Sequence, residues 1–187
     1  MKKYAFLFLL CTIGFSNAQD NQAILENHFN TNRAQMGLSQ EDVSDFKVES
    51  STYSKSMRID NVYVSQRISG IEVFNSTSVF GLKNGVVVSS KMGFIPNTTQ
   101  KINTTTPVIS AQNAIVKAAT AIGINAPTAL EIIQTTAPNS FVFNTGSISL
   151  NNIPVSLVFQ PMQDGTLNLA WDISIYLLDA SHYYSMR

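Results

Sequence analysis

The sequence predicts an α+β fold of two small subdomains, each an antiparallel sheet packed against a helix. Helical periodicity occurs at 20–37 and 110–122, and each stretch is followed by short segments that alternate between apolar and polar residues. Turn signals such as Asn84-Gly85 and Asp164-Gly165 separate these segments, as in antiparallel hairpins. A chain of 187 residues that is 44% hydrophobic is large enough for one good core, or for two of ~80 residues each.

The charge composition excludes two classes of protein. Twelve basic residues balance twelve acidic residues, and the Lys and Arg residues form no cluster, so we expect no nucleic-acid partner. A disordered chain is also excluded, because the sequence combines high apolar content with no net charge.

The N-terminus has the parts of a secretory signal peptide. Lys2 and Lys3 precede an apolar run from Ala5 to Phe15, and Ser16-Asn17-Ala18 offers small residues for cleavage. This run is too short to span a bilayer, which needs ~20 residues. We therefore expect a cleaved signal at 1–18 and a secreted protein, extracellular or periplasmic, with no membrane contact after cleavage. A buried N-terminal helix is the alternative.

The first subdomain is expected at 19–96. A helix at 20–37 ends at Gly37, Ser39 and Asp42 form a capping turn, and a first strand begins at Phe46. The inward stripe of the helix comprises Ile24, Leu25, His28, Phe29, Asn32 and Met36.

Two hairpins follow in this subdomain. A turn at Ser69-Gly70 predicts three cross-strand pairs, which are Ile68 with Ile71, Arg67 with Glu72, and Gln66 with Val73. This register places Gln66 on the apolar face, where its amide needs partners from a neighbouring loop or strand edge. A direct contact of Gln66 with a partner protein is the alternative. Arg67 and Glu72 are expected to form an exposed ion pair. The second turn, Asn84-Gly85, joins strands at 79–82 and 86–88.

Residues 97–107 are polar and rich in threonine, so we expect a linker there and a second subdomain at 108–187. Ser110 caps an alanine-rich helix at 110–122, and strands are expected at about 130–135, 140–144, 153–160 and 167–178. Trp171 is expected in the core. A final strand from His182 to Arg187 is short for its neighbour. We therefore expect a C-terminally incomplete subdomain, from a truncated gene product or a deliberately shortened chain.

The residues of common catalytic centres are scarce. The mature chain holds only His28 and His182, no cysteine, no His-Glu-x-x-His pattern and no glycine-rich phosphate loop. We expect this chain to be no enzyme and to bind no metal or cofactor.

The order of motifs resembles a known family. The segments concerned are Met36–Asp42, Phe46–Val48, Tyr53-Ser54 and Val62–Asn75. They resemble the fungalysin/thermolysin propeptide (FTP) motif, in which a Gln, a Gly-Ile-x-Val step and a later Asn-Gly or Asp-Gly turn recur. Four residues match this pattern, Gln66, Gly70, Val73 and Gly85. The helix from Ser110 and the strand 167–178 resemble a PepSY domain.

The resemblance implies the propeptide of a secreted zinc metallopeptidase precursor. Such a module assists folding of the catalytic domain and blocks its cleft until cleavage. The implied partner is a metallopeptidase catalytic domain, in cis or in trans, and zinc is expected only in that domain, which is missing here. The alternative is a stand-alone secreted or periplasmic PepSY-type binding or inhibitor protein.

Overall fold

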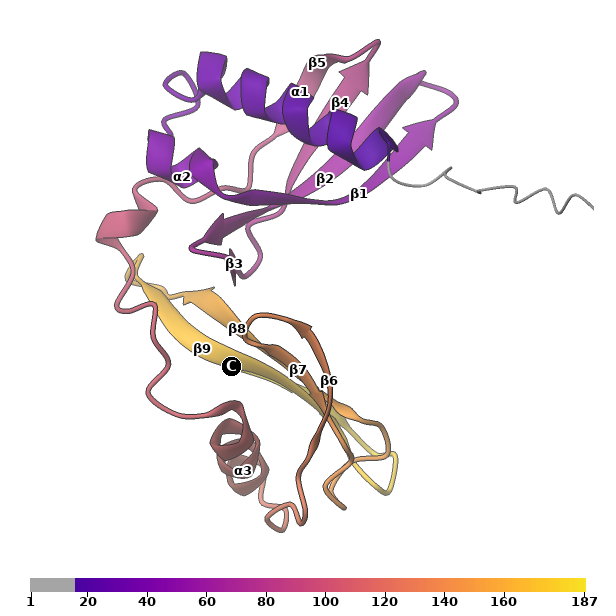
Figure 1. The fold of residues 1–187 in the computed structure, drawn as a ribbon, viewed down its shortest axis with the longest axis vertical. Helices are drawn as coiled ribbons and strands as arrows, with labels where there is room; N and C mark the ends of the chain where they lie inside the picture. The colour runs from indigo at the N-terminus through magenta and orange to yellow at the C-terminus, as the bar shows by residue number, and fades with distance from the viewer. Residues whose placement is uncertain (1–15) are drawn as a thin grey trace, which may run out of the picture.

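The computed structural model describes residues 16–187 of the chain, so most of the predicted signal peptide lies outside it. The described residues form an α+β fold, which confirms the predicted class (Figure 1). A single sheet of ten strands is accompanied by three α-helices, α1 (Ser16–Asn32), α2 (Gln40–Ser44) and α3 (Ala111–Ala121). Among the described residues, no helix has both the length and the apolar content needed to cross a membrane.

The N-terminal half is an antiparallel sheet covered on one face by α1 (Figure 1). Its strands are β1 (Phe46–Ser54), β2 (Ile59–Ile68), β4 (Ser78–Lys83) and β5 (Val86–Lys91). Leu25 and Phe29 of α1 are fully buried against Phe80, whose ring meets that of Phe29 edge-on at 5.4 Å. These contacts confirm the predicted inward stripe and fix α1 on the sheet.

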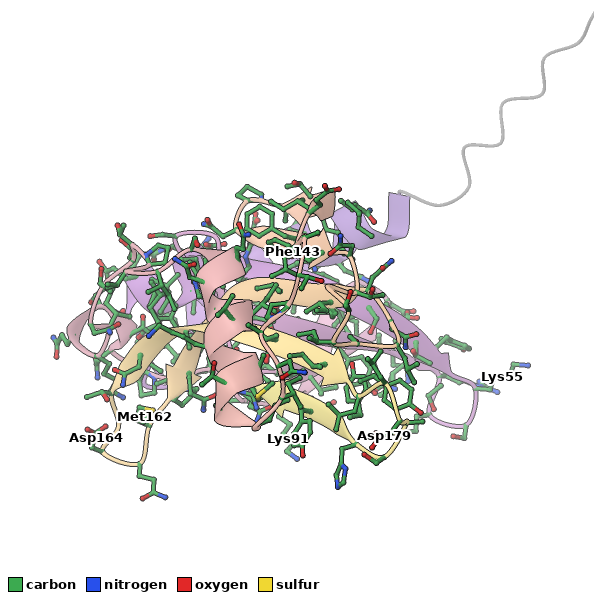
Figure 2. The ribbon with its side chains drawn as sticks, turned by 90° about the horizontal axis from the view of Figure 1, so that it is seen from below. Lys55, Lys91, Phe143, Met162, Asp164 and Asp179 are labelled. Atoms are coloured by element: carbon green, nitrogen blue, oxygen red, sulfur yellow. The ribbon has the colours of Figure 1, made fainter. Side chains whose placement is uncertain are left out.

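The C-terminal half repeats this arrangement with α3 across its sheet (Figure 2). Its strands are β6 (Ile132–Ala137), β7 (Ser140–Phe143), β8 (Ile153–Pro161), β9 (Leu167–Tyr176) and β10 (Tyr183–Met186). The buried face of α3 is mostly alanine, so the helix lies close to β9. Trp171 of β9 is buried in this core, as predicted.

The short strand β3 (Ile71–Val73) joins the two halves into one sheet. It pairs with β2 through Arg67 and Glu72, and with β8 in parallel through Val73 and Phe159. Ile71 and Val73 pack in the hydrophobic cluster of the C-terminal half. A chain boundary at 97–107 therefore does not separate the two cores, because β3 precedes that boundary and contributes to the second core.

The predicted linker is tied down over its first half. Thr98 opens a short 3₁₀ helix, η1 (Thr98–Gln100), and is buried. Ile102 forms a parallel bridge with Leu167, whose amide donates to the Lys101 carbonyl at 2.8 Å. The segment 97–103 is therefore an ordered connection, because its backbone groups find partners that composition did not reveal.

The first hairpin confirms two of its three predicted pairs. Arg67 faces Glu72 and Ile68 faces Ile71, around a turn in which Ser69 and Gly70 both have positive φ. The predicted pair of Gln66 with Val73 is wrong. The backbone amide of Gln66 donates instead to Ser76 Oγ at 3.0 Å, and Val73 pairs with Phe159 of β8.

The predicted ion pair of Arg67 with Glu72 is also wrong. The Arg67 guanidinium donates to the Gly70 carbonyl at 2.6 Å and approaches Asp45 at 3.9 Å. Burial, and then the charge of Glu49, raise the pKa of Glu72 above its usual value. The Arg67 guanidinium therefore interacts with the Gly70 carbonyl and with Asp45, and not with the cross-strand neighbour Glu72.

The remaining elements agree with the predictions except at their ends. Helix α1 ends at Asn32 and not at 37; residues 33–37 form turns closed by Gly37 at φ 73°, and the Leu38 amide donates to the Arg33 carbonyl. The second hairpin turns at Asn84-Gly85, as predicted. Helix α3 is capped by Ser110, also as predicted.

Candidate functional site

Three of the four motif residues meet where the two halves join. Gln66 lies on β2, Gly70 in the turn that follows, and Val73 on β3. Gly85 lies apart from them, in the β4–β5 turn beside Ile24 of α1. The motif therefore marks a junction between β2, β3 and their neighbours, together with one distant hairpin.

Gln66 is fully buried, and both polar atoms of its side-chain amide form hydrogen bonds. Its Nε2 donates to the carbonyls of Asp42 and Ile95, both at 3.0 Å, and its Oε1 accepts from the Ile95 amide at 2.8 Å. The partners lie 24 and 29 residues away in the chain. Gln66 thus connects α2, β2 and the segment that leaves β5, which agrees with the expected tie to a neighbouring loop.

Asp42 forms the second half of this buried network. One carboxylate oxygen accepts from the Ser39 amide at 2.9 Å and the Asn97 amide at 2.8 Å. The other accepts from the amide and hydroxyl of Thr98, both at 2.8 Å. Asp42 therefore completes the predicted capping box and also caps the start of η1, more than fifty residues later. We call Asp42, Gln66, Ile95, Asn97 and Thr98 the junction network.

The carboxylate of Asp42 remains charged because its hydrogen bonds outweigh its burial. Burial alone raises the pKa of Asp42, whereas the bonds from Thr98, Ser39 and Asn97 lower it. The net result is a pKa below the ordinary 3.8. The junction network is thus stabilised by a buried anion that receives four donors.

Gly70 is held by two neighbours at the edge of the junction. Its amide donates to Asp45 Oδ2 at 2.6 Å, and its carbonyl accepts from Arg67. A φ of 80° is a conformation that favours glycine. Val73 is fully buried in the C-terminal core beside this turn. Gln66 and Gly70 thus hold the backbone in place through hydrogen bonds, and Val73 contributes to core packing.

The two histidines of the described residues lie on separate parts of the fold. His28 lies on α1 and His182 follows β9, so the two histidines are on different elements and in different halves. Within residues 16–187, no cluster of His, Cys, Asp and Glu could hold a metal ion.

A groove lies elsewhere, between α3 and the sheet of the C-terminal half. Its volume is about 470 Å³. Ala114, Ala118 and Ala121 of α3 line it, together with Trp171 of β9. Val108, beside the groove, is 95% exposed. The small side chains of α3 leave this space open, and they make the groove largely apolar.

The sequence contained partial signals for both features. Ser39-x-x-Asp42 predicted the capping turn, but its link to Thr98 depends on a contact across 56 residues. The alanine face of α3 predicted close packing, but not the groove beside it. No protein-family model and no curated protein matches this chain.

Proposed function

We propose that this chain is the propeptide module of a secreted zinc metallopeptidase of the fungalysin/thermolysin type. It assists folding of the catalytic domain and inhibits it, in cis or in trans. The chain itself is not catalytic and carries no cofactor, and zinc belongs to the catalytic domain. Secretion follows from the signal-like residues 1–18.

One observation carries most weight in this proposal. Gln66, Gly70 and Val73 of the resembling motif all lie where the two halves are joined, and Gln66 is buried with its amide fully bonded. A motif with this placement specifies a folded surface and supplies no reactive group. Such a surface is what a folding assistant and inhibitor needs, since it acts by binding.

The physical setting also supports the proposal. A secreted protease must remain inactive before export, and its folding is prone to kinetic traps. A preceding domain with a fold of its own offers a template and covers the cleft. When attached in cis it acts at an effective concentration on the order of millimolar, so weak intrinsic binding is enough.

Refolding in trans tests the folding role. The unfolded catalytic domain of a fungalysin-type peptidase from the same genome is diluted from denaturant with and without this chain. We expect a higher yield of active peptidase with the chain, and no gain with the chain unfolded beforehand by covalent modification. An equal yield in both reactions would contradict the folding role.

The apolar groove beneath α3 favours the second candidate, a stand-alone PepSY-type binding or inhibitor protein. The two candidates differ in what the genome and the assay contain. A fungalysin-type peptidase gene in frame or adjacent supports the propeptide. Binding through the groove without any effect on peptidase refolding or activity supports the stand-alone protein.

A further inference from the structure

All three α-helices pack on the same face of the sheet. Strand β2 shows this directly, because alternate residues of a strand lie on one face. Val62 and Val64 belong to the core beneath α1, to which α2 contributes Val43, and Ile68, further along the same face, packs against the core beneath α3. Figure 1 accordingly shows α1 and α3 on two outer sides of the molecule, with the strands between them. In residues 16–187 no helix packs on the other face, which we call the open face.

A row of paired residues crosses the open face where the two halves join. Arg67 of β2 pairs with Glu72 of β3, Glu72 pairs with Val158 of β8, and Val158 pairs with Ala170 of β9. Directly opposite residues of paired strands lie on the same face. Val158 is buried and Ala170 is half-buried, whereas Glu72 is exposed. Glu72 is therefore an accessible carboxylate beside two small apolar side chains.

Glu72 has no cation of its own. In the part of the chain that the structure describes, it forms no ion pair, and the cations of this region pair with other acidic residues. These pairs are Lys47 with Glu49 at 2.7 Å, Arg67 with Asp45 at 3.9 Å, and Arg187 with Asp172 at 2.8 Å. Burial, and then the charges of Glu49 and Asp172, raise the pKa of Glu72. A basic group on a partner would complement this carboxylate.

We propose that the open face around Glu72 is the surface that binds the peptidase catalytic domain, and that this domain places a Lys or Arg side chain against Glu72. This inference rests on the proposed function and adds to it the surface and the kind of group that meets it. Tyr63 of β2 lies on the same face as Arg67 and is 37% exposed, so it offers an aromatic contact beside the charge. Aromatic and charged groups of this kind carry much of the binding energy of an interface.

A pair of glutamate variants tests the charge. A zinc-loaded fungalysin-type catalytic domain from the same genome is titrated with the intact chain, with Glu72→Gln and with Glu26→Gln, and inhibition and direct binding are both measured. Glu26 is the matched control because it is an exposed glutamate on α1, away from the open face. We expect Glu72→Gln to raise the inhibition constant at least about tenfold, and Glu26→Gln to leave it unchanged.

A pair of tyrosine variants tests the face itself. Tyr63 lies on the open face, whereas Tyr53 of β1 lies on the helix side of the sheet, since it pairs with Asp60 of β2. Both side chains are exposed, so their removal should leave the fold intact. We expect Tyr63→Ala to weaken binding of the catalytic domain about tenfold, and Tyr53→Ala to bind like wild type.

The outcomes separate this inference from the proposed function. If wild type inhibits the peptidase and Glu72→Gln and Tyr63→Ala inhibit equally well, the open face is not the surface, and the propeptide function stands. Equal weakening by the control variants also overturns the inference. Sedimentation of the chain alone tests a second copy as the occupant, and a dimer that Glu72→Arg breaks apart would overturn the inference as well. If wild type neither binds nor inhibits the peptidase, the inference and the proposed function are both wrong.

Discussion

The buried polar side chains Asp42 and Gln66 determine how the chain passes between its two halves. Each bonds backbone groups that are distant in sequence, at Ile95, Asn97 and Thr98. Polar groups enclosed in this way stabilise a fold only when all of their partners are present. A single substitution in the junction network should therefore lower the free energy of unfolding by more than the net contribution of one hydrogen bond.

Substitution of Gln66 by leucine tests the buried amide. The leucine keeps the volume roughly constant but leaves the Ile95 amide and two carbonyls without a partner. We expect Gln66→Leu to lower the free energy of unfolding by about 3 kcal/mol in urea titrations. Gln160→Leu, which removes a bond to the adjacent Pro161 carbonyl, should cost less than about 1 kcal/mol. Equal losses in the two variants would contradict the role given to Gln66.

Asp42 should make stability depend on pH in the acidic range. Its pKa is lower in the folded chain, so the unfolded chain takes up the proton first as the pH falls through 3.8. Stability is then lost until the folded carboxylate is itself protonated. We expect the difference in unfolding free energy between wild type and Asp42→Asn to be largest at neutral pH and to shrink below 3.8.

The matched control for replacing an aspartate by asparagine is Asp60→Asn, at a half-buried position on β2. A constant difference for Asp42→Asn over the same range would show that the four donors do not hold an anion.

At the residue scale the sequence was informative about Gln66 and incomplete about Asp42. A polar side chain between Val64 and Ile68 on a strand stands out against its pattern, and the structure places it inside. Asp42 fits a local capping box, and this local role gave no reason to expect further partners. Its bonds to Asn97 and Thr98 come from the tertiary fold, which no local pattern reveals.

At the scale of single elements, helix α1 carries its own pH sensitivity. His28 packs against the ring of Phe80 at 5.8 Å, and in the described chain its Nε2 is buried without a partner. Burial lowers the pKa of His28 below its ordinary 6.5. The groove around it is lined by uncharged residues such as Asn27, Thr31 and Val87. A protonated His28 would therefore weaken the attachment of α1.

Substitution of His28 by phenylalanine removes this titration and keeps an aromatic ring. Because the unfolded histidine binds a proton more readily than the folded one, wild-type stability should fall as the pH drops through 6.5. We expect His28→Phe to lose less stability than wild type between pH 7.5 and 5.5, measured by thermal unfolding. His182→Phe, at an exposed position, is the matched control for replacing a histidine by phenylalanine. Parallel curves for all three proteins would contradict the role of His28.

Elements were predictable where local patterns decide them. The Asn84-Gly85 turn and the Ser110 cap are local, and both lie where expected. The end of α1 was misplaced by five residues, since the apolar stripe continues to Met36 while the chain already turns after Asn32. Met36 still packs on the core from that turn. Periodicity therefore identified the buried face but could not distinguish helix from turn.

For the whole molecule, the segment after Ile102 should be the part most open to proteolysis. Residues up to 103 are held by bonds to β9, whereas Val108 is almost fully exposed. We expect limited proteolysis with thermolysin, which cuts before large apolar residues, to cleave first at 104–109. Mass spectrometry of early fragments gives the position. First cleavage within the paired strands at 60–95 would contradict the fold described.

The connection between the halves could not be predicted from the sequence. Strand β3 is three residues long and pairs in parallel with β8, more than eighty residues later. Its pattern predicted the hairpin with β2 correctly but carried no sign of a second partner. The apolar, alternating residues of β3 fit either core, and the tertiary structure places Ile71 and Val73 in the second.

We propose that this chain acts by binding a metallopeptidase catalytic domain and does no chemistry itself. The most direct test is a titration of a folded, zinc-loaded fungalysin-type catalytic domain from the same genome with the intact chain, following cleavage of a fluorogenic peptide. We expect a saturable loss of activity that reverses when the chain is digested, and no activity of the chain alone. Undiminished activity at a large molar excess of folded chain would contradict it.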